Sequence, residues 1–502
     1  MVSTPVMARR HRSGLPAGTW SLIALGLPFV GAVTVVGIYL NKEIIVAAAW
    51  VAFVVAGAVL FDPLVGVIAM SGGFLLAAYP TVLQDLGVLT INNLLGLVLG
   101  VALLAYVLGS RDLSFLLVWQ VLVLAAIGVV ILLSTAHAAV LFPTMRASQS
   151  LGVKGKLLDR TPDMMHDFFA RLVFLIFICA FVRGRRDVKA LFTTYVMVLL
   201  LAVPSALINW WQGTLENGFR AMASVTAGAN ANRLAMICLM EVGCWWCWLK
   251  VRPSTVRWVV GGAAIGAAFL VVLATGSRSG LVGCGVLVFL LQTGPRFFRA
   301  TKAQVVLAAA AAVVAVLTVV PSEAWERMLT FSTDVHVEDT MAERGAASSL
   351  ALREDTIRVG FEMFYDHPLL GVGLGNYREV SRQIYLDPHF RPPHNSVMWA
   401  ASEGGLFVLG GYLLFFTLTW RELRTILRLA HRDPSIAHLA AALRIVFCLY
   451  CAFSLLADLW LNPITYVLVG LIICLRRYLE NLPATAPVVG IGRGRPALAL
   501  AR

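Results

Sequence analysis

Long apolar runs, separated by short polar turns, recur along the chain from Trp20 to Leu475. Each run has about 17–25 residues, which is the length that a helix needs to cross about 30 Å of hydrocarbon. No comparable stretch alternates between apolar and polar residues, as the strands of a membrane-spanning barrel do. The pattern therefore predicts an all-α, polytopic membrane helix bundle.

The apolar runs predict about fourteen transmembrane helices. Their approximate bounds are 20–40, 43–61, 63–80, 92–109, 114–137, 166–184, 189–212, 229–249, 257–274, 279–293, 303–321, 397–420, 438–457 and 459–476. Two polar stretches, 138–165 and 322–393, are too long to be simple turns. Long loops on such a scaffold often carry function.

Charged residues are scarce and unevenly placed. They make up 13% of the 502 residues, against about 25% in soluble proteins. The net charge of +13 does not indicate nucleic acid as a partner, because most basic residues lie in short turns, where they set the orientation of the spans. These turns hold Arg111; Arg183, Arg185, Arg186 and Lys189; Lys250, Arg252 and Arg257; Arg296, Arg299 and Lys302; and Arg421, Arg424, Arg428 and Arg432.

Basic turns alternate with turns that are poor in Lys and Arg, which predicts that both ends of the chain lie in the cytoplasm. The expected division comprises a cytoplasmic amino-terminal segment, about eleven membrane helices, a large outer loop, three further membrane helices and a cytoplasmic tail. The bounds of these segments are 1–19, 20–321, 322–396, 397–476 and 477–502. The outer loop leads into the helix that carries Glu403.

All eight cysteines lie within apolar runs. Two CxxC pairs, Cys244 with Cys247 and Cys448 with Cys451, allow a metal or redox interpretation. We favour the alternative, that these small polarizable side chains pack between helices. No H-E-x-x-H motif or carboxylate cluster suggests a metal ion, so we expect no metal.

Two arginines lie in turns so short that they must stand near the outer mouth of the bundle. Arg278 belongs to the stretch Thr275–Gly280, which is almost the whole connection between two spans. Arg220 lies in another outer turn, ahead of Asn230 and Asn232, either of which could cap the next helix. A guanidinium at this depth can hold phosphate oxygens through two parallel hydrogen bonds. The alternative is an interfacial arginine whose head group reaches water.

The large outer loop ends at Pro392 and Pro393, immediately before His394. The prolines favour a helix start just after them, so we expect His394 on the first turn of a membrane helix. Histidine exchanges a proton near neutral pH, which makes it a candidate general base, although a lone interfacial histidine is usually inert. Glu403 follows nine residues later, roughly on the opposite face of a regular helix, so the two need not share a site.

The glycine-rich stretch Gly371–Tyr377 resembles a phosphate-binding loop only superficially. No strand precedes it and no Lys-Ser/Thr pair follows it, as dinucleotide or P-loop binding would require. We interpret it as a tight turn within the outer loop.

Three signatures together resemble the O-antigen ligase and O-antigen polymerase superfamily of bacterial inner membranes. The first is Arg220 ahead of an Asn-rich helix start, and the second is the turn around Arg278. The third and most specific runs from Arg353 to Gly410 and contains D-H-P-L-L-G-V-G-L-G-N-Y, H-N-S and E-G-G-L. The resemblance covers residues 215–425 well and the amino-terminal helices only in hydropathy.

This resemblance implies a glycosyltransferase that moves a glycan from undecaprenyl diphosphate onto an acceptor hydroxyl at the periplasmic face of the inner membrane. It implies no metal, no nucleotide sugar and no other cofactor. The acceptor would be another lipid-linked repeat, for a polymerase, or a lipid core, for a ligase. We place the polymerase first, because nothing in the sequence marks a lipid-core partner.

The resemblance also implies roles for particular residues. Arg220, Arg278 and Arg353 would bind the diphosphate, and His394 would deprotonate the acceptor. Supporting residues would be Glu403 and Asn395. Membrane lipid and other proteins of polysaccharide assembly are the further partners that it implies.

Two other classes of function stay open. A transporter or flippase of lipid-linked glycan would have paired helices interrupted by Gly or Pro, with charges near the membrane midplane. The candidate charges here cluster at one face instead, which favours chemistry at that face. A scaffold protein of a polysaccharide assembly would tolerate the loss of His394 and Arg278.

Overall fold

The computed structural model describes residues 53–75, 91–142, 160–223, 230–331, 340–387 and 391–483. Within these ranges the chain is helical, apart from turns and one isolated bridge between Glu216 and Arg220. The helices are α3 (Pro63–Leu75), α5 (Ile91–Ser110), α6 (Trp119–Leu141), α8 (Thr161–Phe181), α9 (Arg185–Leu199), α10 (Ala202–Trp211), α11 (Ala231–Val251), α12 (Thr255–Ala274), α13 (Arg278–Thr293), α14 (Lys302–Thr318), α15 (Ser322–Leu329), α16 (Met341–Asp366), α17 (Tyr377–Gln383), α18 (Ser396–Leu429), α19 (Pro434–Ser454) and α20 (Pro463–Glu480).

The described residues contain nine helical stretches long and apolar enough to cross a membrane, and α3 and α13 are shorter apolar helices. Each predicted span from 63–80 onward coincides with a helix, except that 189–212 is divided between α9 and α10. The chain is therefore a polytopic helical membrane protein. The predicted span 20–40 and most of 43–61 lie outside the described residues, so the total of about fourteen stays a prediction.

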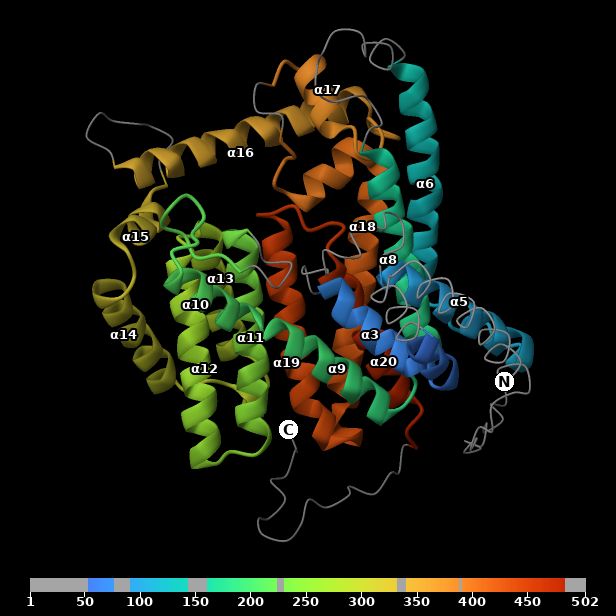
Figure 1. The fold of residues 1–502 in the computed structure, drawn as a ribbon, viewed down its shortest axis with the longest axis horizontal. Coiled ribbons are helices and arrows are strands. Elements are labelled where there is room, and N and C mark those ends of the chain that lie inside the picture. Colours follow the sequence, from blue (N-terminus) through green and yellow to red (C-terminus); the bar gives the residue numbers. More distant parts are fainter. Residues whose placement is uncertain are drawn as a thin grey trace, which may run out of the picture.

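One helix, α16, lies across an end of the upright helices, with α15 leading up to it and α17 near its other end (Figure 1). We call this the α16 end. The basic turns meet at the opposite end, where Arg185 pairs with Asp433 at 3.3 Å and Arg477 donates to the Ser114 carbonyl at 3.1 Å. The polar outer loop thus folds into helices that cover one end of the bundle.

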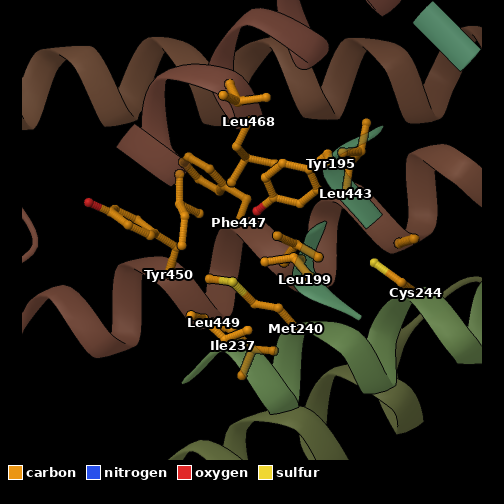
Figure 2. Packing of buried hydrophobic residues seen from close by; sticks show 14 of the residues in the cluster. Tyr195, Leu199, Ile237, Met240, Cys244, Leu443, Phe447, Leu449, Tyr450 and Leu468 are labelled. Atoms are coloured by element: carbon orange, nitrogen blue, oxygen red, sulfur yellow. The ribbon is translucent and has the colours of Figure 1, made fainter. Parts of the chain in front are cut away.

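Helix α11 is at the centre of the larger core, where α9, α12, α13 and α19 pack against it. Figure 2 shows Met240 and Cys244 of α11 facing Tyr195, Leu443 and Phe447, which come from α9 and α19. All eight cysteines are unpaired and five of them are buried, as the packing interpretation predicts.

Helix α18 is broken at Gly405, whose φ of 65° is left-handed. The break leaves main-chain groups on both sides of Gly405 free to bond outside the helix. The carbonyls of Ser402 and Glu403 accept hydrogen bonds of 2.9 Å from Val372 and Gly373, and the Leu406 N–H donates to the outer loop. The glycine-rich stretch is therefore a tight turn, as predicted, and it is clamped against the break in α18.

Candidate functional site

A cavity of about 530 Å³ opens at the α16 end of the bundle. Four arginines line it, namely Arg220, Arg327, Arg353 and Arg391, together with His394, Glu216 and the amides of three asparagines. We call it the arginine cavity. It brings together three of the residues predicted from sequence, His394, Arg220 and Arg353, which lie far apart along the chain.

Arg220 is almost fully engaged by the protein. Its Nε donates to the Thr275 carbonyl at 2.8 Å, and its Nη1 donates to Glu216 Oε1 at 2.7 Å. Its Nη2 donates to Asn232 Oδ1 at 3.3 Å, and the side chain is only 5% exposed. Arg220 therefore joins two turns and adds positive charge to the cavity wall.

The two asparagines at the start of α11, beside Arg220, have different roles. Asn230 caps α11, because its side chain accepts from the Asn232 N–H at 2.9 Å. Asn232 Oδ1 instead accepts from the Ser277 hydroxyl at 2.7 Å as well as from Arg220. Of the two predicted capping residues, Asn230 is thus the cap.

Arg278 is the first residue of α13 and lies behind the cavity wall rather than on it. Its Nη1 donates to the Thr330 carbonyl at 2.9 Å, and its Nη2 donates to the Ala346 carbonyl at 3.0 Å. The guanidinium therefore joins α13 to the end of α15 and to the first half of α16. Its role in binding diphosphate stays a prediction.

Arg327 and Arg353 add two further positive charges to the arginine cavity. Arg353 was predicted from the sequence, whereas Arg327 was not. Burial, followed by the nearby charges of Arg220 and Arg278, lowers the pKa of Arg327 to about 10. Burial, followed by the same two charges, lowers the pKa of Arg353 to about 10. Both guanidinium groups stay protonated at neutral pH, so the cavity concentrates positive charge that an anion would stabilise.

His394 faces a carboxylate that the sequence analysis missed. Its Nδ1 lies 3.8 Å from Asp458 Oδ1, and Arg233 Nη2 lies 3.2 Å from Asp458 Oδ2. Burial alone would raise the pKa of Asp458, but the contacts with His394 and the charge of Arg233 lower it overall. The carboxylate is therefore ionised beside the imidazole.

The position of His394 differs from the expectation in one respect. Helix α18 begins at Ser396 and Asn395 is its cap, so His394 precedes the first turn instead of lying on it. Its φ of 45° is left-handed. The Asn395 side chain accepts from the N–H groups of Val397 and Met398 at 3.0 Å, so it supports the site by capping the helix. The prolines stop the preceding chain, but the asparagine decides where the helix starts.

Ser396 holds the segments of His394 and Asp458 together. Its hydroxyl donates to the Ala457 carbonyl at 2.8 Å and accepts from the Leu459 N–H at 2.8 Å. These two bonds flank Asp458 and fix its turn against the start of α18.

Glu403 is absent from the residues that line the arginine cavity. It is 2% exposed, and its Oε1 accepts from the Tyr377 N–H at 3.1 Å. Its carbonyl accepts from Gly373 and from the Ser134 hydroxyl. Glu403 therefore holds the glycine-rich turn on α18, which is structural support at a distance from His394.

A second cavity, of about 380 Å³, lies on the other side of Asp458. Asp458, Arg233, Arg378, Trp399 and Asn462 are among the residues that line it. The His394–Asp458 pair therefore stands between two polar cavities, because His394 lines the first and Asp458 lines the second.

Residues 263–415 match the family model described as O-antigen ligase. This stretch of the chain is similar to an O-antigen ligase domain. The matched stretch runs from α12 into α18 and includes Arg278, Arg353 and His394, whereas Arg220 and Asp458 lie outside it. No curated protein matches the chain. The domain agrees with the resemblance drawn from the three sequence signatures.

Several residues of the site were not predicted from sequence, namely Arg327, Arg391, Arg233 and Asp458. A signal for Asp458 existed, since it is the whole connection between the predicted spans 438–457 and 459–476. That confinement is the property that singled out Arg278. Within the part of the chain that the structure describes, no three His, Cys, Asp or Glu side chains gather as a metal site requires.

Proposed function

We propose that the protein transfers a glycan from undecaprenyl diphosphate to an acceptor hydroxyl in the assembly of a surface polysaccharide. The observation that carries this proposal is the arginine cavity, which has His394 on its wall. The similarity of residues 263–415 to the O-antigen ligase family supports it. Membrane proteins of this family act on lipid-linked glycans. The particular reaction is our inference from the site.

The diphosphate would occupy the arginine cavity. Arg327, Arg353 and Arg391 line it, and among the described residues the guanidinium groups of Arg327 and Arg353 make no hydrogen bond or ion pair. Diphosphate is a good leaving group once its charge is neutralised, and preorganised guanidinium groups supply this neutralisation as the charge develops. Arg220 and Arg278 would add to the positive potential from behind these side chains.

His394 would act as the general base. Its Nδ1 faces Asp458, so Nε2 is the nitrogen left for the proton of the acceptor hydroxyl. The carboxylate would hold the imidazole in this tautomer and stabilise the imidazolium that forms. In one displacement the acceptor oxygen bonds to the anomeric carbon, the bond from that carbon to the phosphate oxygen breaks, and the proton passes to His394. This step inverts the anomeric configuration.

The acceptor would approach through the second cavity. Trp399 offers an aromatic face, and Asp458, Arg378 and Asn462 offer hydrogen-bonding groups, a combination suited to a sugar ring. The chemistry of these groups fits a glycan acceptor, which a lipid-linked repeat and a lipid core both offer. We retain the polymerase ahead of the ligase because nothing in the sequence marks a lipid-core partner.

The proposed orientation puts the α16 end in the periplasm of a bacterium, where lipid-linked repeats are polymerised. The clustering of the basic turns at the opposite end supports it, because Lys and Arg favour the cytoplasmic side. Both termini would then be cytoplasmic and residues 322–396 periplasmic.

A transfer assay tests the proposed function. The purified protein, in nanodiscs, is given undecaprenyl-diphosphate oligosaccharide with either a second lipid-linked repeat or a lipid core, and the new glycosidic bond and the released undecaprenyl diphosphate are measured. Arg353→Ala should lower the rate at least about tenfold, because a hydrogen bond to a charged group contributes about 1.5–3 kcal/mol. Arg358→Ala is the matched control, since Arg358 is on the same helix and its side chain is 64% exposed.

Equal rates in the two variants would contradict the role of the cavity. If intact donor crosses the membrane of vesicles that contain the protein, and no new glycosidic bond forms, the protein is a transporter and not a transferase.

A further inference from the structure

A lateral groove of about 400 Å³ runs between α12 and α14. Its walls are apolar apart from one glutamine, and they include Gly262, Gly266 and Phe269 of α12 and Ala308 and Ala311 of α14. In Figure 1, α14 stands at the edge of the bundle beside α12. We call this cavity the α12–α14 groove.

The groove is open because the two helices do not pack closely. A Cβ atom added to Gly262 or Gly266 would meet nothing within 4 Å, whereas one added to Gly261 would lie 2.7 Å from Leu249. No residue of α14 is buried. Helices that pack in membranes usually bring such small residues into close contact, so the free space over these glycines is available to a ligand.

One end of the groove adjoins the arginine cavity. Leu273 lines that end, and the next two residues of the chain contact the loop of Arg220. The Ala274 carbonyl accepts from the Ala221 N–H at 2.9 Å, and the Thr275 carbonyl accepts from Arg220 Nε at 2.8 Å. On the other wall, α14 leads directly into α15, which carries Arg327.

The geometry points to the α12–α14 groove as the binding site for the polyprenyl chain of the donor, whose diphosphate would occupy the arginine cavity. This inference rests on the proposed function. The α12 wall runs from Trp258 to Leu273, a rise of about 22 Å along the helix. That is most of the hydrocarbon depth of about 30 Å. A ligand with an anionic head and a long apolar chain matches both cavities at once.

Filling the groove tests the inference. Gly266→Phe places a ring in the open space, and Gly285→Phe is its matched control. Gly285 is also exposed, on α13, and a Cβ atom there meets nothing within 4 Å, but it does not line the groove. Both variants are assayed with the same glycan on a full-length polyprenyl diphosphate and on a diphosphate with only two isoprene units.

We expect Gly266→Phe to lower transfer from the long-chain donor at least about tenfold, since excluding two buried methylene groups suffices for that factor. Transfer from the short-chain donor should be unchanged, and Gly285→Phe should leave both donors unaffected. Equal losses on both donors, or undiminished transfer from the long one, would overturn the groove as the chain site.

A binding experiment separates this inference from the proposed function. Polyprenyl diphosphate without glycan, carrying a diazirine on its chain, is photolysed with the wild-type protein, and the labelled peptides are mapped. Labels on α12 and α14 that Gly266→Phe abolishes support the groove, even if no glycan is transferred. Equal labelling by a diazirine phospholipid would show an ordinary lipid site and overturn the inference.

Discussion

Three features of the structure constrain His394, whose backbone is left-handed. Its backbone precedes a capped helix, its ring faces Asp458, and Ser396, two residues further on, is hydrogen-bonded to both neighbours of that aspartate. A residue constrained in this way is preorganised for one task. We therefore expect substitution there to affect the rate and not the binding of the donor.

His394→Ala and His394→Gln should both lower transfer at least about 100-fold, because a positioned base contributes about 10²–10⁴-fold. Binding of undecaprenyl diphosphate should stay close to wild type, since the arginines are unchanged. Transfer by purified His394→Ala at a rate near wild type would contradict the role of base, and carboxylates of the outer loop would then be tested.

Asp458→Asn should lower kcat at least about tenfold, because a loss of about 1.4 kcal/mol of imidazolium stabilisation has this effect. The affinity for the donor should change little. Asp458→Glu should recover part of the rate, since it restores the charge. The control is Asp355→Asn, a half-exposed aspartate on α16. A fall in donor affinity with an unchanged kcat would instead place Asp458 in donor binding.

Arg278→Lys should lower activity at least about tenfold while the protein still inserts. A lysine keeps the charge but cannot reach the carbonyls of Thr330 and Ala346 together, and each bond to a charged group is worth about 1.5–3 kcal/mol. Activity and the amount of membrane-inserted protein are measured beside Arg358→Lys. Near-normal activity of Arg278→Ala would show that the connection is dispensable.

The sequence predicted those site residues that lie in a very short turn or belong to a family signature. Arg220, Arg353 and His394 were found in this way and line one cavity. Arg327 was missed because the sequence of a short amphipathic helix such as α15 gives no sign that its arginine is buried. The pairing of His394 with Asp458 depends on how α18 and the last turn pack, which a local pattern does not contain.

Among the elements, α18 carries the sharpest departure from regular geometry. At Gly405 an ideal Cβ would lie 2.3 Å from the carbonyl group of Leu369, in addition to the positive φ. This close approach is what lets the glycine-rich turn bind the freed carbonyls. Only glycine satisfies both requirements.

Gly405→Ala should therefore lower the free energy of unfolding by more than the roughly 1–2 kcal/mol that a left-handed alanine costs. Gly410→Ala is the control on the same helix, because nothing lies within 4 Å of its added Cβ. It should be neutral or stabilising by about 0.5–1 kcal/mol. Thermal unfolding in detergent measures both, and equal midpoints would mean that the break is not required.

Helices were predictable where hydrocarbon dictates their length. From residue 63 on, each apolar run became a helix, and the break between α9 and α10 has a local cause in Pro204, whose ring clashes with the carbonyl four residues earlier. Helices α15, α16 and α17 were not predicted, because their sequences are polar and lack the apolar runs used for the spans.

For the whole molecule, the two ends of the bundle should lie on opposite sides of the membrane. Met341 is exposed on α16, and Arg424 is exposed near the basic end of α18. We expect Met341→Cys to react with a membrane-impermeant thiol reagent added from outside, and Arg424→Cys to react only after permeabilisation. The unsubstituted protein gives the background of the native cysteines. Labelling at 424 but not at 341 would reverse the orientation.

The pairing of His394 with Asp458 also bears on biosynthesis. The ribosome adds Asp458 more than sixty residues after His394, in the turn that precedes α20. While the chain is still being inserted, the imidazole has no carboxylate partner, although most of the arginines are already present. The His394–Asp458 pair can thus form only after the last helical hairpin has entered the membrane.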